Sequence, residues 1–129
     1  MAARLEKTVV ECPEPLALAG FYADLLGMQV LEERDDWVVI GHEPGMRELA
    51  FQRPEQWVPP APWPGGEARL HLDIHVNDVD EATAQVLARG AVRAPGAPET
   101  GYRVFLDPVG HPFCLIHGRK RESDPRWRD

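Results

Sequence analysis

"RLHLDIHVNDVDEATAQVLARGA", residues 69–91, is the stretch that decides the fold. Polar and apolar side chains alternate over its first eight residues, which is typical of a half-buried strand. Asn77 or Asp78 is suited to cap the segment that follows, and Gly90 is suited to end it, so a helix is predicted over residues 77–90. The stretch therefore predicts a strand that leads directly into a helix.

The same order occurs earlier in the chain. TVVEC, residues 8–12, is rich in β-forming residues, and residues 14–27 carry apolar side chains at helical spacing and end at Gly27. Short β-rich segments follow each helix, at residues 28–34, 36–42 and 47–53 in the first half and at residues 91–95, 102–107 and 111–118 in the second. The sequence thus predicts an α+β fold of two repeated modules, each consisting of a strand, a helix and two or three further strands, with the helix on one face of the sheet.

A proline-rich segment separates the two halves. PEQWVPPAPWPGGE, residues 54–67, is suited neither to a helix nor to a central strand. We predict a single domain over residues 1–129, with module one at about 6–53, module two at about 68–118 and a charged tail at 119–129.

The net charge and the distribution of apolar residues argue against several classes of function. The net charge of −7 argues against a nucleic-acid backbone as the main partner, and no run of residues is long and apolar enough to span a membrane. The N-terminal residues lack the apolar core of a signal peptide, so we expect a cytoplasmic protein. Cys12 and Cys114 are then expected to remain reduced.

The polar side of the strand at residues 69–76 is the first candidate site. Alternation places His71, Asp73 and His75 on one face, and packing of Phe113 against the helix places Cys114 on that face too. Residues four apart in a strand are about 13 Å apart, whereas two ligands of one metal ion are only ~3–4 Å apart. The two histidines therefore cannot chelate one ion.

Three interpretations of His71 remain open: a ligand of a divalent metal, an acid–base or binding residue of a metal-free pocket, and a hydrogen-bonded core histidine. Cys114 is interpreted as a small buried side chain or as a nucleophile. From the first strand, Lys7 and Glu11 are expected to join the pocket. Trp57 and Trp63, held by the prolines, are candidates for an aromatic clamp at its mouth.

Three segments resemble the vicinal oxygen chelate superfamily, which includes glyoxalase I, extradiol dioxygenases and bleomycin-resistance proteins. They are FY…LLG in the first helix, HLD…GA in residues 71–91 and DP-G-FCL in residues 107–115, and the resemblance extends from about Glu6 to His117. It implies paired βαβββ modules that curl around a cavity, and it implies a homodimer.

The resemblance also implies metal-ligand positions, which fall on Lys7, Gln52, His71 and Cys114. Only His71 keeps the usual residue, and a charged lysine has no lone pair to offer a metal. We therefore expect a degraded metal site and no resident cofactor, with a divalent metal at His71 as the alternative.

Two functions follow as hypotheses. The first is a glyoxalase-like lyase or isomerase of a small molecule, in which His71 and Cys114 are catalytic. The second is a metal-free protein that sequesters an antibiotic or metabolite, as bleomycin-resistance proteins do, with Trp57 and Trp63 stacking on the ligand. The remaining residues expected to contact a ligand are Lys7, Glu11, Gln52, Asp73 and His75.

Overall fold

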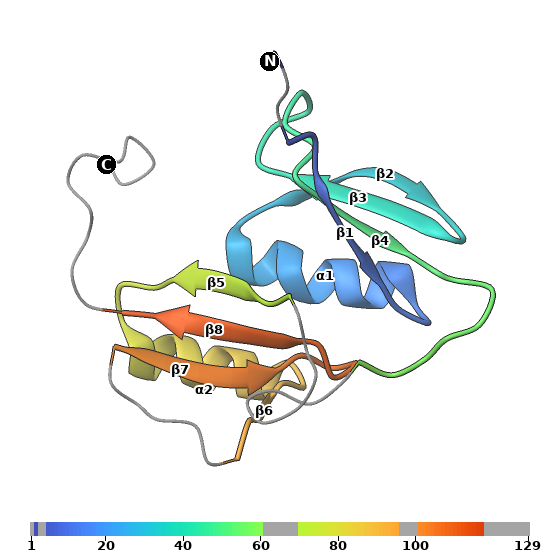
Figure 1. Ribbon diagram of the computed structural model, residues 1–129. Coiled ribbons are helices and arrows are strands. Elements are labelled where there is room, and N and C mark those ends of the chain that lie inside the picture. The colour runs from blue at the N-terminus through green and yellow to red at the C-terminus, as the bar shows by residue number, and fades with distance from the viewer. Residues whose placement is uncertain (1, 3–4, 61–69, 96–100, 118–129) are drawn as a thin grey trace. The chain divides into compact units, whose positions relative to one another are not determined.

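The computed structural model describes residues 2, 5–60, 70–95 and 101–117 (Figure 1). The chain divides into two compact units, Met1–Pro59 and Pro60–Asp129. Each unit contains a four-stranded mixed sheet and one helix, which confirms the predicted α+β fold of two βαβββ modules. Within the described residues, no helix has the length and apolar character needed to cross a membrane.

The first unit follows the predicted order of a strand, a helix and three strands. Its sheet has the order β1-β4-β3-β2, in which β1 and β4 are parallel and the other neighbours are antiparallel. Its elements are β1 (Thr8–Glu11), α1 (Pro15–Leu26), β2 (Gln29–Arg34), β3 (Trp37–Gly41) and β4 (Leu49–Gln52).

Local sequence explains where α1 begins and ends. Pro15 occupies the first turn, where its missing N–H costs no helical hydrogen bond. Gly27 ends the helix in the left-handed region, at φ 70°, and its N–H donates to the Ala23 carbonyl. The buried face of α1 packs on the sheet, where Tyr22 stacks on Phe51 with ring centroids 5.7 Å apart.

The second unit repeats this arrangement. Its sheet has the order β5-β8-β7-β6, again with the first pair parallel. The first strand is shorter than predicted, because it begins one residue after His71. The elements are β5 (Leu72–His75), α2 (Val79–Ala88), β6 (Val92–Arg93), β7 (Tyr102–Leu106) and β8 (Pro112–Ile116).

Apolar side chains fill the space between α2 and its sheet. Phe105 and Phe113 are fully buried and stack with ring centroids 5.5 Å apart. Arg103 ties β7 to α2, since its guanidinium donates to Thr83 Oγ1 and Asp80 Oδ1, both at 3.0 Å. This layer is thus mainly an apolar core.

Asp107 organises the turn between β7 and β8. Its buried carboxylate accepts the backbone N–H groups of Val109 at 2.9 Å and His111 at 3.0 Å. This pattern is an Asx-type turn, in which a side chain replaces a backbone acceptor. His111 is therefore a turn residue, and the turn fixes where β8 begins.

The predicted linker contains no helix or strand over residues 54–60. The rest of the linker, residues 61–67, and the charged tail, residues 119–129, lie outside the described residues.

The two helices offer a matched test of capping. Asp78 caps α2 by accepting the N–H groups of Asp80 at 3.1 Å and Glu81 at 3.0 Å, whereas Glu14 at the start of α1 makes no side-chain cap. We expect Asp78→Ala to lower the free energy of unfolding by about 1 kcal/mol, because two helix N–H groups lose their acceptor. Glu14→Ala should change it by less than about 0.5 kcal/mol. Urea unfolding of both variants checks this; equal losses would show that the Asp78 cap contributes nothing.

Candidate functional site

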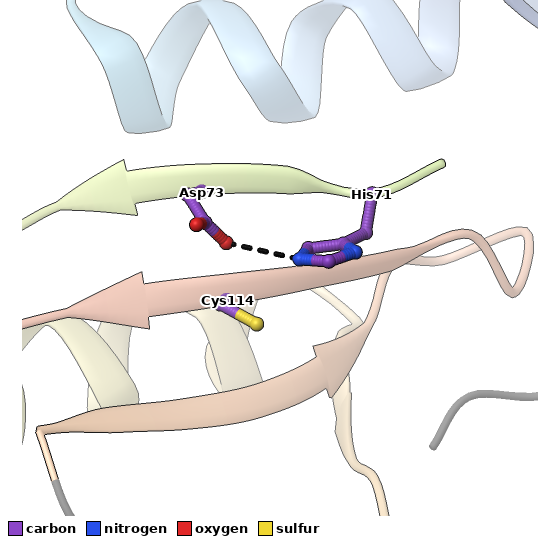
Figure 2. Close-up of side chains that lie close together, drawn as sticks. All are labelled: His71, Asp73 and Cys114. Carbon is purple, nitrogen blue, oxygen red and sulfur yellow. Dashed lines mark ion pairs between the residues drawn. The ribbon is translucent and has the colours of Figure 1, made fainter. Parts of the chain in front are cut away.

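His71, Asp73 and Cys114 lie together on one face of the second sheet (Figure 2). His71 immediately precedes β5, Asp73 lies within it, and Cys114 lies on β8 directly opposite Asp73 in the parallel register. His71 Nε2 is 3.2 Å from Asp73 Oδ1. One donor atom from each residue lies within 4.8 Å of the others. The strand alternation thus brings together three of the predicted site residues.

The apolar residues of β5 and β8 hold this cluster in register. Leu72 pairs with Phe113, and Ile74 pairs with Leu115. The side chains of Phe113, Ile74 and Leu115 are buried. A slip of one residue would move all of them to the opposite face of the sheet, so burial fixes the register strongly. The side chains between them then share the other face.

The three side chains of the cluster differ in their exposure to solvent. The side chains of His71 and Asp73 are 33% and 58% exposed, whereas Cys114 is 2% exposed. Cys114 packs in an apolar cluster with Ala94 and Val104. The imidazole and the carboxylate are therefore accessible to a ligand, and the thiol lies beneath them.

Burial, followed by the charge of Asp73 and a hydrogen bond to it, raises the pKa of the Cys114 thiol to about 12. The thiol is neutral at pH 7, where its S–H donates to the Asp73 carboxylate. A cysteine nucleophile requires a lowered pKa, so this environment argues against that interpretation of Cys114. It favours the interpretation of Cys114 as a small buried side chain, with an added hydrogen bond.

The raised pKa makes stability depend on alkaline pH. The thiol of the unfolded chain loses its proton near pH 9.0, whereas the folded protein keeps it up to about pH 12. Between these two pH values the native state binds more protons than the unfolded state, so the free energy of unfolding falls as pH rises. The stability that the protonated Cys114 contributes is fully present below pH 9.0. We expect wild type to lose more stability than Cys114→Ala between about pH 8 and about pH 11, with Asp73→Asn intermediate. Urea unfolding across this range checks it, and parallel curves for wild type and Cys114→Ala would contradict it.

The donor set fits a metal ion in part. Imidazole nitrogen, carboxylate oxygen and thiolate sulfur are all ligands of Zn²⁺, whose ligands lie ~3–4 Å apart, so the 4.8 Å spread requires a small closure. The ion would also have to displace the proton of the thiol. If bound, the metal would be held by His71, Asp73 and Cys114 and would supply a Lewis acid for a carbonyl oxygen.

Three of the predicted site residues, Lys7, Glu11 and Gln52, belong to the first unit. The Lys7 side chain is 12% exposed, its ammonium contacts Glu6 at 2.8 Å, and it lies 5.9 Å from the centre of the Trp37 ring. Glu11 and Gln52 are exposed and pair in register at the ends of β1 and β4. That these side chains share one pocket with His71 stays a prediction.

The remaining predicted site residues are His75, Trp57 and Trp63. His75 is half-buried at the end of β5 with its Nε2 atom enclosed, which fits a packing role. Trp57 is half-buried after β4, and Trp63 lies outside the described residues. The proposed aromatic clamp therefore stays a prediction.

His42 has a role that the sequence did not suggest. Its ring nitrogens lie 2.7 Å from Glu48 Oε2 and 3.1 Å from the Leu26 carbonyl, so it joins the end of β3 to the end of α1. The sequence contains no signal for this, because the partners are 6 and 16 residues away.

A cavity of about 310 Å³ lies at the start of α1 in the first unit. The Arg53 guanidinium bonds the Asp35 carboxylate there at 2.9 Å, and this bond and the arginine charge lower the pKa of Asp35. None of the predicted site residues that the structure describes lines this cavity. Its lining residues are Glu14, Pro15, Leu16, Glu33, Arg34, Asp35 and Arg53.

Comparison with family models identifies the family of this chain. The chain belongs to the glyoxalase-like domain family, whose model matches residues 7–116. The resemblance to the vicinal oxygen chelate superfamily is thereby confirmed. A search of curated proteins finds no significant match.

Solved structures share the fold at low identity. A glyoxalase/bleomycin resistance protein/dioxygenase family enzyme from Burkholderia phytofirmans is 19% identical with a TM-score of 0.66, over 89% of this chain and 98% of that one. The trypanothione-dependent glyoxalase I of Leishmania major is 21% identical with a TM-score of 0.63, over 90% and 87%. The fosfomycin resistance protein FosX of Mesorhizobium loti is 15% identical with a TM-score of 0.65, over 95% and 98%. At these identities the likeness establishes the fold.

Proposed function

We propose that the protein is a glyoxalase-like lyase or isomerase that moves a proton on a small carbonyl compound, with His71 as the acid–base residue. The observation that carries the proposal is the contact of 3.2 Å between His71 Nε2 and the Asp73 carboxylate, at an accessible position on the sheet. An imidazole whose Nε2–H donates to a carboxylate carries its basic lone pair on Nδ1. Asp73 thus selects the tautomer that accepts a proton at Nδ1.

The chemistry of this pair is proton transfer. His71 Nδ1 takes a proton from the carbon next to the substrate carbonyl, and the C–H electron pair forms an enolate. Asp73 stabilises the imidazolium that results, as a carboxylate does beside a catalytic histidine. For a substrate with an α-hydroxyl group, transfer of the hydroxyl proton to the former carbonyl oxygen and return of the proton from His71 to the former carbonyl carbon complete an isomerisation. For a substrate with a leaving group on the carbon beyond the enolate, expulsion of that group completes an elimination.

Cys114 has a supporting role in this proposal. Its neutral thiol donates to Asp73 from below, while His71 contacts the same carboxylate from the side. Two donors on one carboxylate restrict its rotation, so Asp73 stays aligned with the ring. Cys114 thereby acts as a positioning residue, and the reacting proton passes through His71 alone.

Binding without turnover is the second candidate, and the residue at position 7 favours it. The resemblance implies a metal ligand there, but the chain has an ammonium group engaged by Glu6 and Trp37. The loss of that donor is consistent with a sequestration protein of the bleomycin-resistance type.

Deuterium exchange distinguishes the two candidates across a panel of carbonyl compounds. Small α-hydroxy ketones and 2-oxo acids are incubated with the protein in D₂O, and loss of the α-proton signal is followed by NMR. Faster exchange of at least one compound supports the enzyme. Binding of compounds with no acceleration of exchange supports sequestration and contradicts the enzyme.

A further inference from the structure

A second charged group lies in the first unit, outside the His71 cluster. Lys7 directly precedes β1 and Trp37 begins β3, with β4 between those two strands in the sheet (Figure 1). The Lys7 ammonium nevertheless lies over the Trp37 ring, 5.9 Å from its centre. The side chains of Lys7 and Trp37 therefore approach each other across the face of β4, and the Lys7 side chain is only 12% exposed.

The ammonium is balanced by a carboxylate from the adjacent residue. Lys7 Nζ donates to Glu6 Oε2 at 2.8 Å, although the Glu6 side chain is 80% exposed. The hydrogen bond and charge of Lys7 lower the pKa of Glu6, and the charge of Arg47 contributes to a lesser extent. The largely buried Lys7 ammonium is thus neutralised by the solvent-exposed Glu6 carboxylate. An ion pair of this kind is weak, so another anion can take the place of Glu6.

Arg47 adds positive charge beside this pair. It bonds the Glu32 carboxylate at 2.6 Å, and Glu32 also contacts Arg34 at 3.1 Å. Three cations, Lys7, Arg34 and Arg47, thus accompany two anions, Glu6 and Glu32. The group carries a net positive charge in a chain whose total is −7, and removal of Glu6 from its position would increase that local excess.

We propose that the Glu6 carboxylate occupies an anion-binding site formed by Lys7, Arg47 and the Trp37 ring, and that a small aromatic carboxylate binds there by displacing it. The ligand carboxylate replaces Glu6 on the Lys7 ammonium, where the charge-assisted hydrogen bond is retained. The flat indole of Trp37 offers a surface for an aromatic ring beside that charge. The proposal uses residues of the first unit alone, so it is independent of the proton transfer assigned to His71.

The probe for this site is 4-nitrobenzoate, with neutral 4-nitrobenzamide as its matched control. The chain has four tryptophans, so the indole N–H signal of Trp37 is assigned by NMR from its loss in Trp37→Phe. Binding is then followed in the protein with Trp37 intact. We expect the benzoate to shift the Trp37 signal, and the benzamide at the same concentration to leave it in place.

Two variants test the displacement in opposite directions. Lys7→Gln should weaken binding of 4-nitrobenzoate by about tenfold, because the charged donor is lost. Glu6→Gln should strengthen it by about two- to fivefold, because the competing anion is removed. Glu43→Gln, at an exposed position, changes the total charge by the same amount and should leave binding at the wild-type value.

Three results would overturn the proposal: equal shifts from the benzoate and the benzamide, unchanged binding in Lys7→Gln, or Glu6→Gln binding no tighter than Glu43→Gln. If Lys7→Gln does not fold, the comparison of Glu6→Gln with Glu43→Gln decides by itself. No turnover is measured, so the outcome does not depend on whether His71 is catalytic.

Discussion

His71→Gln is expected to lower the rate of α-proton exchange by about 10²–10⁴-fold, the usual contribution of a positioned acid–base residue. Glutamine preserves a polar side chain of similar reach but has no basic nitrogen. The loss should appear in the exchange rate at saturating substrate more than in the concentration needed for saturation, since the proton moves only in the transition state. The measurement is NMR exchange in D₂O, on a compound that the wild-type protein accelerates.

A second histidine provides the control for this result. His42→Gln removes an imidazole from the first unit, where the ring contacts Glu48 and the Leu26 carbonyl. It should leave the exchange rate within about twofold of wild type while lowering the free energy of unfolding by about 1 kcal/mol. If His71→Gln retained more than half of the wild-type rate, His71 would not be the base.

A variant of Asp73 distinguishes the positioning of His71 from proton transfer itself. Asp73→Asn retains the shape of the side chain but removes the charge that stabilises the imidazolium, and it replaces one of the two acceptor oxygens with an NH₂ donor, which weakens the selection of the tautomer. Its exchange rate should therefore fall below that of wild type and remain above that of His71→Gln.

The sequence predicted the fold well because its signals are local. Period-two alternation, helical spacing and the glycines at positions 27 and 90 each specify a short segment, and together these segments order the chain into two βαβββ modules. The predicted strand at β5 is too long for the same reason, because it too rests on a local signal. Alternation extends the pattern to residues 69–76, whereas pairing with β8 supports a strand only over Leu72–His75.

The candidate site could be predicted only in part. Side-chain alternation along one strand placed His71 beside Asp73, and the packing of Phe113 placed Cys114 on the same face. The protonation of Cys114 could not be predicted, because it depends on burial by residues distant in sequence and on the carboxylate across the strand pair. The contact between Lys7 and Trp37 was missed for a similar reason, since it spans a third strand whose position follows from the sheet order.

Phe113→Ala is expected to produce the largest loss of stability, about 3–5 kcal/mol, because it leaves a cavity at a fully buried position that stacks on Phe105. Phe113 also pairs with Leu72 in the register that places Asp73 opposite Cys114. Chemical denaturation measures the loss, and Phe113→Leu, which fills most of the volume, should lose only about 1–2 kcal/mol.

The same pair of variants tests whether core packing sets the geometry of the site. At a temperature where Phe113→Ala remains folded, the looser contact between β5 and β8 should let solvent reach the Cys114 thiol and should weaken its hydrogen bond to Asp73. Burial and the hydrogen bond, two of the three causes of the raised pKa of Cys114, then diminish, so alkylation of this thiol at pH 8 should be faster in Phe113→Ala than in Phe113→Leu or wild type. Equal alkylation rates in all three proteins would show that the cluster keeps its geometry without Phe113, and the register would then depend on Ile74 and Leu115.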